Sequence, residues 1–227
     1  NSASLLLSCL LLQLLVSAAT ASSCTPKQAL LLLGEKYYRG PRIVLRDDPL
    51  DLAKIVWVTL DNCTDGYVAI TNVNTSNQTS TYKPKIEEKS EYINLTKNGV
   101  HSEGNYTRFS HTAELTNIST DTLYAATIYS GNETISFKFK MPEVDRKDKP
   151  FTFLVYADFD KSNVSQPTFN QLKTILSNDT TEIDFTLFNG DVAYEIVYDA
   201  GVKGDDFFEE FQSVATTRPL IMAPGNH

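Results

Sequence analysis

The apolar pattern of this chain changes its period near residue 142, and this change limits the fold more than any single motif does. Before it, short apolar or alternating runs lie between turn signals, at 55–62, 66–73, 122–130 and 133–140. Several strands of this length and spacing predict a β-sandwich. Tyr124 follows a polar turn, so we expect its hydroxyl to bond the turn backbone, as in the corner of immunoglobulin-like sandwiches.

After the change, continuous apolar runs alternate with segments of helical spacing. The runs 151–157, 183–189 and 219–223 predict buried strands. Between them, two segments place apolar side chains on one helical face each, namely Phe169, Leu172, Ile175 and Leu176, then Phe207, Phe208, Phe211 and Val214. The order β-α-β-α-β predicts a parallel sheet with crossover helices. The polar run 143–150 predicts a linker.

The amino end resembles a secretory leader. Residues 5–16 are an apolar run of signal-peptide length, and Ala19-Thr20-Ala21 supplies a cleavage pattern, so we expect a signal peptide over 1–21. Cleavage leaves Cys24 and Cys63 as a pair that an oxidising compartment would allow to form a disulfide.

Glycosylation signals support the same route. Nine Asn-x-Ser/Thr sequons, where composition predicts about three by chance, lie at Asn62, Asn74, Asn77, Asn94, Asn105, Asn117, Asn132, Asn163 and Asn178. We therefore expect a secreted, lysosomal or vacuolar glycoprotein without a membrane span after cleavage. A net charge of −8 and a pI near 4.9 argue against nucleic-acid partners and anionic membranes.

Polar side chains follow each of the three predicted parallel strands. Asp158, Asp191 and Asn226 come one to three residues after an apolar run, 33 and 35 residues apart. The carboxyl ends of parallel strands form one crevice, so we expect these side chains to converge. Their oxygens suit hard or borderline cations, and Asp191 could bridge two of them for displacement at phosphorus. Tyr194 is close enough in sequence to ligate as a phenolate, and His227 to act as a proton donor or to stabilise charge.

These residues carry a resemblance to a known family. The motifs ADFD, GDVAY and GNH resemble, in order and spacing, the first three of five metal-ligand blocks in the calcineurin-like metallophosphoesterases, and the tyrosine in GDVAY is typical of purple acid phosphatases. The upstream sandwich is similar to that family's fibronectin-III-like domain. The resemblance implies a fibronectin-III-like domain over 22–142 and a truncated metallophosphoesterase domain over 151–227.

The resemblance also implies the chemistry. Asp158 and Tyr194 would bind Fe(III), Asp191 would bridge, Asn226 would bind a divalent Fe, Zn or Mn ion, and His227 would contact the phosphate. A hydroxide held by the metals would attack phosphorus, so the expected reaction is hydrolysis of small phosphate monoesters at acidic pH. Two further blocks with three histidine ligands would lie beyond His227, so we expect the 227 residues alone to be an inactive fragment.

One position departs from the family pattern. Asp160 stands where the family has Gly, and its carboxylate could ligate, turn to solvent or indicate altered chemistry. Two alternatives therefore stay open: an inactive secreted glycoprotein that acts as an interaction module, and a phosphodiesterase or pyrophosphatase on the same scaffold. His101 and His111 belong to the predicted sandwich, where we expect surface or packing roles.

Overall fold

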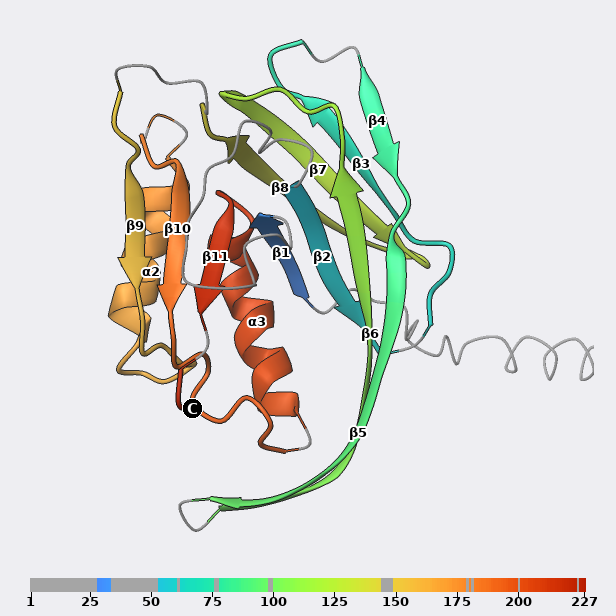
Figure 1. The fold of residues 1–227 in the computed structure, drawn as a ribbon, viewed down its shortest axis with the longest axis vertical. Coiled ribbons are helices and arrows are strands. Elements are labelled where there is room, and N and C mark those ends of the chain that lie inside the picture. The colour runs from blue at the N-terminus through green and yellow to red at the C-terminus, as the bar shows by residue number, and fades with distance from the viewer. Residues whose placement is uncertain are drawn as a thin grey trace, which may run out of the picture.

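The computed structural model describes residues 28–33, 53–60, 62–75, 78–97, 100–143, 149–178, 180, 182–199, 201–223 and 225–227. Within them the chain forms a seven-stranded sheet, a four-stranded sheet and the helices α2 (Gln166–Leu176) and α3 (Val202–Ala215) (Figure 1). The seven-stranded sheet has the order β5-β6-β2-β1-β11-β10-β9 and the four-stranded sheet the order β4-β3-β7-β8.

The four-stranded sheet and part of the seven-stranded sheet form the predicted β-sandwich. The four-stranded sheet consists of β3 (Tyr67–Asn72), β4 (Thr79–Tyr82), β7 (Thr122–Ser130) and β8 (Glu133–Met141). Its inward side chains share one core with those of β2 (Ala53–Thr59) and β6 (Val100–Leu115), a core that includes Trp57, Ile128 and Phe139. The β-rich fold read from the short alternating runs is confirmed.

The corner predicted for Tyr124 is present. Its hydroxyl oxygen accepts a hydrogen bond of 2.7 Å from the backbone N–H of Ser119, five residues earlier. The Tyr124 ring is buried and stacks on Phe139, with centroids 5.3 Å apart. The side chain therefore ties the polar turn to the sandwich core.

The β-α-β-α-β order is also confirmed. Strands β9 (Phe153–Tyr156), β10 (Phe185–Asn189) and β11 (Leu220–Ala223) are parallel neighbours. The helices bury their apolar faces with this sheet in one cluster, to which α2 contributes Phe169, Leu172 and Leu176, and α3 contributes Phe207, Phe211 and Val214. Ile175 and Phe208, predicted for the same faces, are half-buried. Phe153 and Val155 on the edge strand β9 are 49% and 51% exposed.

A strand that the periodicity did not predict joins the two parts. β1 (Gln28–Leu33) pairs antiparallel with β2 and parallel with β11, where Leu32 is in register with Leu220. Strands from the ranges predicted for the sandwich and for the catalytic domain therefore share one sheet. The domain boundaries stay a prediction, and residues 144–148 of the predicted linker lie outside the described residues.

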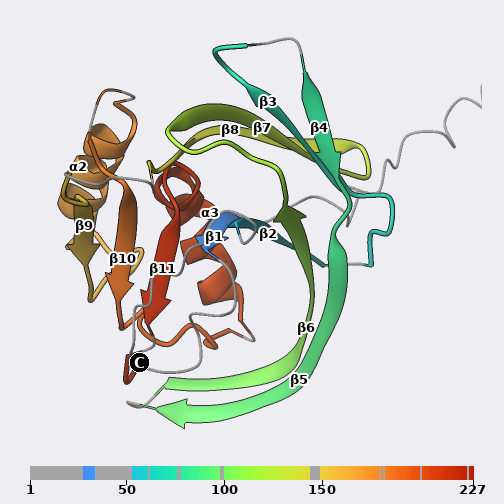
Figure 2. The same cartoon turned by 45° about the horizontal axis from the view of Figure 1, so that its top comes forward.

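The long hairpin of β5 (Lys85–Lys97) and β6 was not predicted either. Its antiparallel register runs from Lys85 opposite Thr112 to Lys97 opposite Val100. The two strands leave the sandwich and curve past the side of α3 (Figure 2). The sequence does carry one signal for it, because the dipeptide Asn98-Gly99 is a strong marker of a two-residue hairpin loop.

Several export signals fall outside the described residues, namely the predicted signal peptide 1–21, Cys24 and Asn77. Cys63 is disulfide-bonded, and its pairing with Cys24 stays a prediction. The other eight sequon asparagines are all exposed. Among the described segments, neither helix has the length and apolar character needed to cross a bilayer.

Candidate metal centre

The three loops that carry the predicted ligands meet at the carboxyl ends of β9, β10 and β11. In Figure 1 the last residue of the chain lies just beyond the ends of these strands. The loops after β9 and β10 run parallel and bond each other: the N–H of Asp158 donates to the Gly190 carbonyl at 3.2 Å, and the N–H of Phe159 donates to the Asp191 carbonyl at 3.3 Å. The expected convergence of the strand ends is therefore present in the backbone.

Asp158 and Tyr194 meet through their side chains. The Tyr194 hydroxyl donates a 2.7 Å hydrogen bond to Asp158 Oδ1, across 36 residues of sequence. This bond, with smaller contributions from burial and from the charges of Asp158, Asp191 and Asp160, raises the pKa of the Tyr194 phenol to about 12. The carboxylates around the phenol disfavour its anion, and a nearby cation would favour it.

Asp191 is held against the last residues of the chain. Its Oδ1 accepts hydrogen bonds from the backbone N–H groups of Asn226, at 2.8 Å, and His227, at 3.0 Å. This approach requires glycine at position 225, because a Cβ there would lie 1.9 Å from Asp191 Oδ1 and 2.2 Å from its backbone N. The Gly-Asn-His sequence thus lets the third loop close on the second.

The loop after β10 carries backbone strain. Asp191, Ala193, Tyr194 and Glu195 have φ values of 51°, 63°, 42° and 74°, so three consecutive residues without glycine lie in the left-handed region. This conformation costs L-residues roughly 1–2 kcal/mol each. Strain of this kind persists only where neighbouring contacts hold it, and it gathers at functional sites.

His227 has a carboxylate partner that the sequence did not reveal. Its Nδ1 lies 2.6 Å from Glu195 Oε1, and the Glu195 residue is only 8% exposed. An ionised Glu195 accepts from Nδ1–H, which leaves Nε2 as the ring nitrogen for other partners. The His227 ring also lies against Tyr194, with centroids 5.0 Å apart. Glu195 follows Tyr194 directly, but nothing in the local pattern predicts a buried acid there.

Asp160 takes a role in the loop before α2. Its Oδ1 accepts hydrogen bonds from Ser165 Oγ at 2.9 Å and from the Ser162 N–H at 3.1 Å. Burial by itself would raise the pKa of Asp160, but the hydrogen bonds from Ser162 and Ser165, together with the charge of Lys203, hold it below its ordinary value. The carboxylate therefore closes the turn into α2, a contact that the sequence did not predict.

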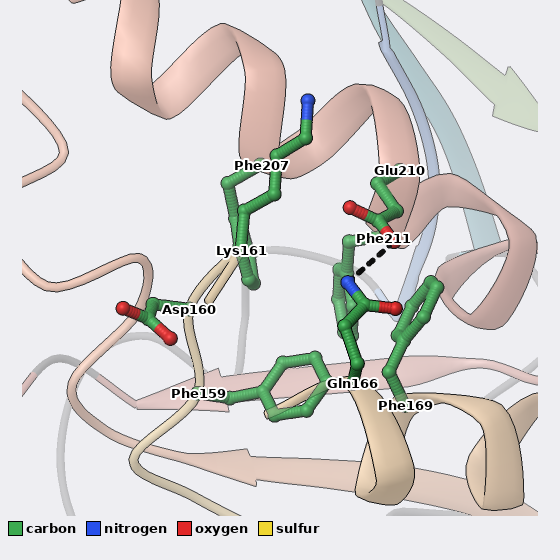
Figure 3. Close-up of a pocket in the computed structure, with 8 residues that line it drawn as sticks. All are labelled: Phe159, Asp160, Lys161, Gln166, Phe169, Phe207, Glu210 and Phe211. Carbon is green, nitrogen blue, oxygen red and sulfur yellow. Dashed lines mark hydrogen bonds between the residues drawn. The ribbon is translucent and has the colours of Figure 1, made fainter. Parts of the chain in front are cut away.

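A hollow between α2 and α3 lies beside this loop (Figure 3). Rings of Phe159, Phe169, Phe207 and Phe211 line it, and Gln166 Nε2 donates to Glu210 Oε1 at 2.9 Å within it. Figure 3 shows the Asp160 carboxylate directed away from these rings. None of the predicted metal ligands lines the hollow, so it is a packing feature of the helical layer.

The residues at the strand ends fit a metal centre by their donor chemistry. Two carboxylates, a phenol and an amide are oxygen donors that suit hard cations, and Tyr194 and Asp158 already place two of them 2.7 Å apart. Within the described residues, no group of three or more His, Cys, Asp or Glu side chains is arranged to hold a metal ion. The predicted ligand set contains only two residues of these types, Asp158 and Asp191.

Comparison with known proteins points to one group. No protein-family model matches the chain. A stretch of 75 residues, 33% of this chain, is 32% identical to acid phosphatase type 7 of Danio rerio and covers 16% of that protein. The structure is similar to that of purple acid phosphatase PPD1 from seeds of yellow lupin (Lupinus luteus), with a TM-score of 0.59 and 17% identity, over 89% of this chain and 35% of that chain.

The chain thus has a fold similar to that of a purple acid phosphatase. The expected resemblance to the purple acid phosphatases is confirmed, by the local sequence match to an acid phosphatase and by the similarity of fold to a purple acid phosphatase. The chain spans well under two thirds of the length of either relative.

Proposed function

We propose that this chain contributes the first part of the active site of an acid phosphatase that hydrolyses phosphate monoesters. The observation that carries the proposal is the convergence of Asp158, Tyr194, Asp191 and the segment 225–227 at the ends of three parallel strands, with Tyr194 bonded to Asp158 at 2.7 Å. The similarities to an acid phosphatase and to a purple acid phosphatase support the same activity.

The resemblance to the purple acid phosphatases implies how a pair of ions would be held. Asp158 and Tyr194 would bind Fe(III), Asp191 would bridge, and Asn226 would bind a divalent Fe, Zn or Mn ion. A centre of this kind supplies activation of water near neutral or acidic pH and neutralises charge that develops on the phosphoryl oxygens.

The protein's own residues have separate tasks in this proposal. The N–H groups of Asn226 and His227 orient Asp191, and Asp158 orients the Tyr194 phenol, whose oxygen would be a donor to the cation. Glu195 holds Nδ1 of His227, so Nε2 would donate to an oxygen of the phosphate ester.

The colour of the iron-loaded protein tests the proposal. In the full-length protein, a ferric–tyrosinate charge-transfer band should appear in the visible range, and Tyr194→Phe should abolish it and lower hydrolysis of p-nitrophenyl phosphate at pH 5 by about 10- to 100-fold. Tyr156→Phe is the matched control, because Tyr156 is buried on β9 among Phe188 and Phe211. A band that survives in Tyr194→Phe would show that another residue is the ligand.

The two alternatives differ in the same assay. The inactive-relative interpretation drew its support from Asp160, and the contacts of Asp160 with Ser162 and Ser165 give that residue a place in the loop instead. An iron-loaded protein that does not hydrolyse p-nitrophenyl phosphate would support the inactive-relative interpretation again. Faster hydrolysis of bis(p-nitrophenyl) phosphate than of the monoester would favour the phosphodiesterase.

We propose further that the protein enters the secretory pathway and is glycosylated. The exposure of all eight described sequon asparagines supports this, since each is open to the transferase and to a bound glycan. Protein from a eukaryotic host should lose apparent mass on treatment with an N-glycosidase, and an unshifted band would contradict the proposal.

A further inference from the structure

The left-handed turn Ala193–Glu195 needs partners that hold it in place. Three of its contacts stay within the site: the Ala193 N–H donates to the Phe159 carbonyl at 2.9 Å, the Tyr194 hydroxyl bonds Asp158, and Glu195 bonds His227. None of these three contacts involves the backbone carbonyl of Tyr194, the central residue of the turn.

A lysine from α3 binds that carbonyl. Lys203 Nζ donates to the backbone oxygen of Tyr194 at 2.5 Å, and the same ammonium lies 5.5 Å from the centroid of the Tyr198 ring. The lysine is half-buried and therefore partly shielded from competing water. A charge-assisted hydrogen bond of this kind is stronger than a neutral one.

The position of Lys203 in the helix is unfavourable by itself. It lies in the first turn of α3, where the positive end of the helix dipole disfavours a cation. The contacts with the Tyr194 carbonyl and the Tyr198 ring offset this disadvantage. The position of Lys203 is therefore explained by its contact with the turn Ala193–Glu195 and not by the preferences of α3.

The next two residues anchor the same helical turn. The Gly204 N–H donates to the Ile196 carbonyl at 3.1 Å, and a Cβ at Gly204 would lie 2.5 Å from Ile196 Cγ1. Asp205 Oδ2 accepts from Arg108 of β6 through Nε at 2.8 Å and through Nη2, and both side chains are at most 15% exposed. The hairpin strand β6, which runs beside α3 in both ribbon views (Figures 1 and 2), thus holds the start of this helix.

We propose that Lys203 is a positioning residue that holds the left-handed turn, and with it Tyr194 and Glu195, and that Arg108 acts through Asp205 to fix the helix that carries Lys203. The sandwich strand β6 thereby contributes to the geometry of a site on the other part of the chain. The inference rests on the proposed function only where it treats Tyr194 as a ligand. The conformation of the turn itself can be tested without metal.

Amide hydrogen exchange of the metal-free protein tests the positioning role. Lys203→Met should raise exchange in residues 193–199 on the order of tenfold, as expected for one lost charge-assisted bond, while the sandwich strands stay protected. Lys203→Arg keeps a cationic donor and should restore part of the protection. Arg108→Gln should raise exchange in the same segment by a smaller factor.

Lys161→Met is the matched control. The Lys161 ammonium lies 3.9 Å from Asp206 of α3, but Lys161 has no bond to the Tyr194 carbonyl. Its removal should leave exchange in 193–199 as in the parent protein. Unchanged exchange there in folded Lys203→Met, or an equal rise in Lys161→Met, would overturn the proposal. If Lys203→Met does not fold, unchanged exchange of residues 193–199 in Arg108→Gln would overturn the proposal instead.

The iron-loaded protein separates this inference from the proposed function. The maximum of the tyrosinate band should shift in Lys203→Met and stay in place in Lys161→Met. A parent protein without any such band contradicts the role of Tyr194 as a ligand, and the exchange result still decides the role of Lys203.

Discussion

His111 should make the stability of the sandwich depend on pH in the acidic range. It is fully buried on β6, directly opposite Trp57 of β2, with the two rings stacked 5.0 Å apart. Its Nε2 lies 2.8 Å from Thr59 Oγ1. Burial disfavours the imidazolium and lowers the pKa of His111 from 6.5 to about 4.

The sign and size of the effect follow from proton linkage. The unfolded chain takes up a proton on His111 below about pH 6.5, and the folded protein does so only near pH 4. The unfolded state therefore binds more protons in this window, so stability falls as the pH drops from 6.5 to 4 and is fully present above 6.5. A difference of about 2.5 pH units at 1.36 kcal/mol per unit predicts a loss of about 3 kcal/mol.

Urea unfolding followed by Trp57, the single tryptophan of the chain, measures this loss. His111→Phe keeps an aromatic ring against Trp57 and should flatten the pH dependence between pH 4 and 6.5 by up to about 1.4 kcal/mol per pH unit relative to the parent. Thr59→Val keeps the buried imidazole and should retain the parent slope. Equal slopes in His111→Phe and the parent would refute the reasoning, because they would mean that His111 binds its proton equally in both states.

Three further changes test the site and the sandwich. Gly225→Ala should push the third loop away from Asp191, because the new Cβ would lie 1.9 Å from Asp191 Oδ1, and metal affinity in the full-length protein, measured by calorimetry, should fall about 10- to 100-fold. Asp160→Ala removes the acceptor that closes the turn into α2, so thermal unfolding should show a loss of about 1–3 kcal/mol while the visible band stays in place. Tyr124→Phe leaves the Ser119 N–H without its 2.7 Å acceptor and should lower the free energy of unfolding by about 1–2 kcal/mol, and an unchanged value would contradict the corner role.

Much of the architecture could be read from local sequence. Alternation with period two and apolar spacing near 3.6 are properties of short segments, so the β-rich first part and the β-α-β-α-β order were both predictable. Asp158, Asp191 and Asn226 could be selected as candidate ligands for a related reason, since each follows its own strand by a few residues and parallel strands end on one side of a sheet. The Tyr124 corner spans only five residues and is local in the same sense.

Apart from the β5–β6 hairpin, the features that the sequence did not predict depend on residues far apart in the chain. β1 is an apolar run whose neighbours β2 and β11 come from opposite ends of the sequence, with Leu32 in register with Leu220. Periodicity identifies which face of a strand is apolar, and pairing between distant strands is chosen by the packing of the whole chain. No window of sequence contains that information.

At the site the same division holds. The sequence by itself determined which residue types stand at the strand ends, because their spacing is local. Only the tertiary structure set Glu195 against His227, 32 residues away, and linked Arg108 to Asp205 across 97 residues. Each of these contacts forms between loops or elements that chain folding brings together, so the partner of a polar side chain is decided by the fold and not by its neighbours in sequence.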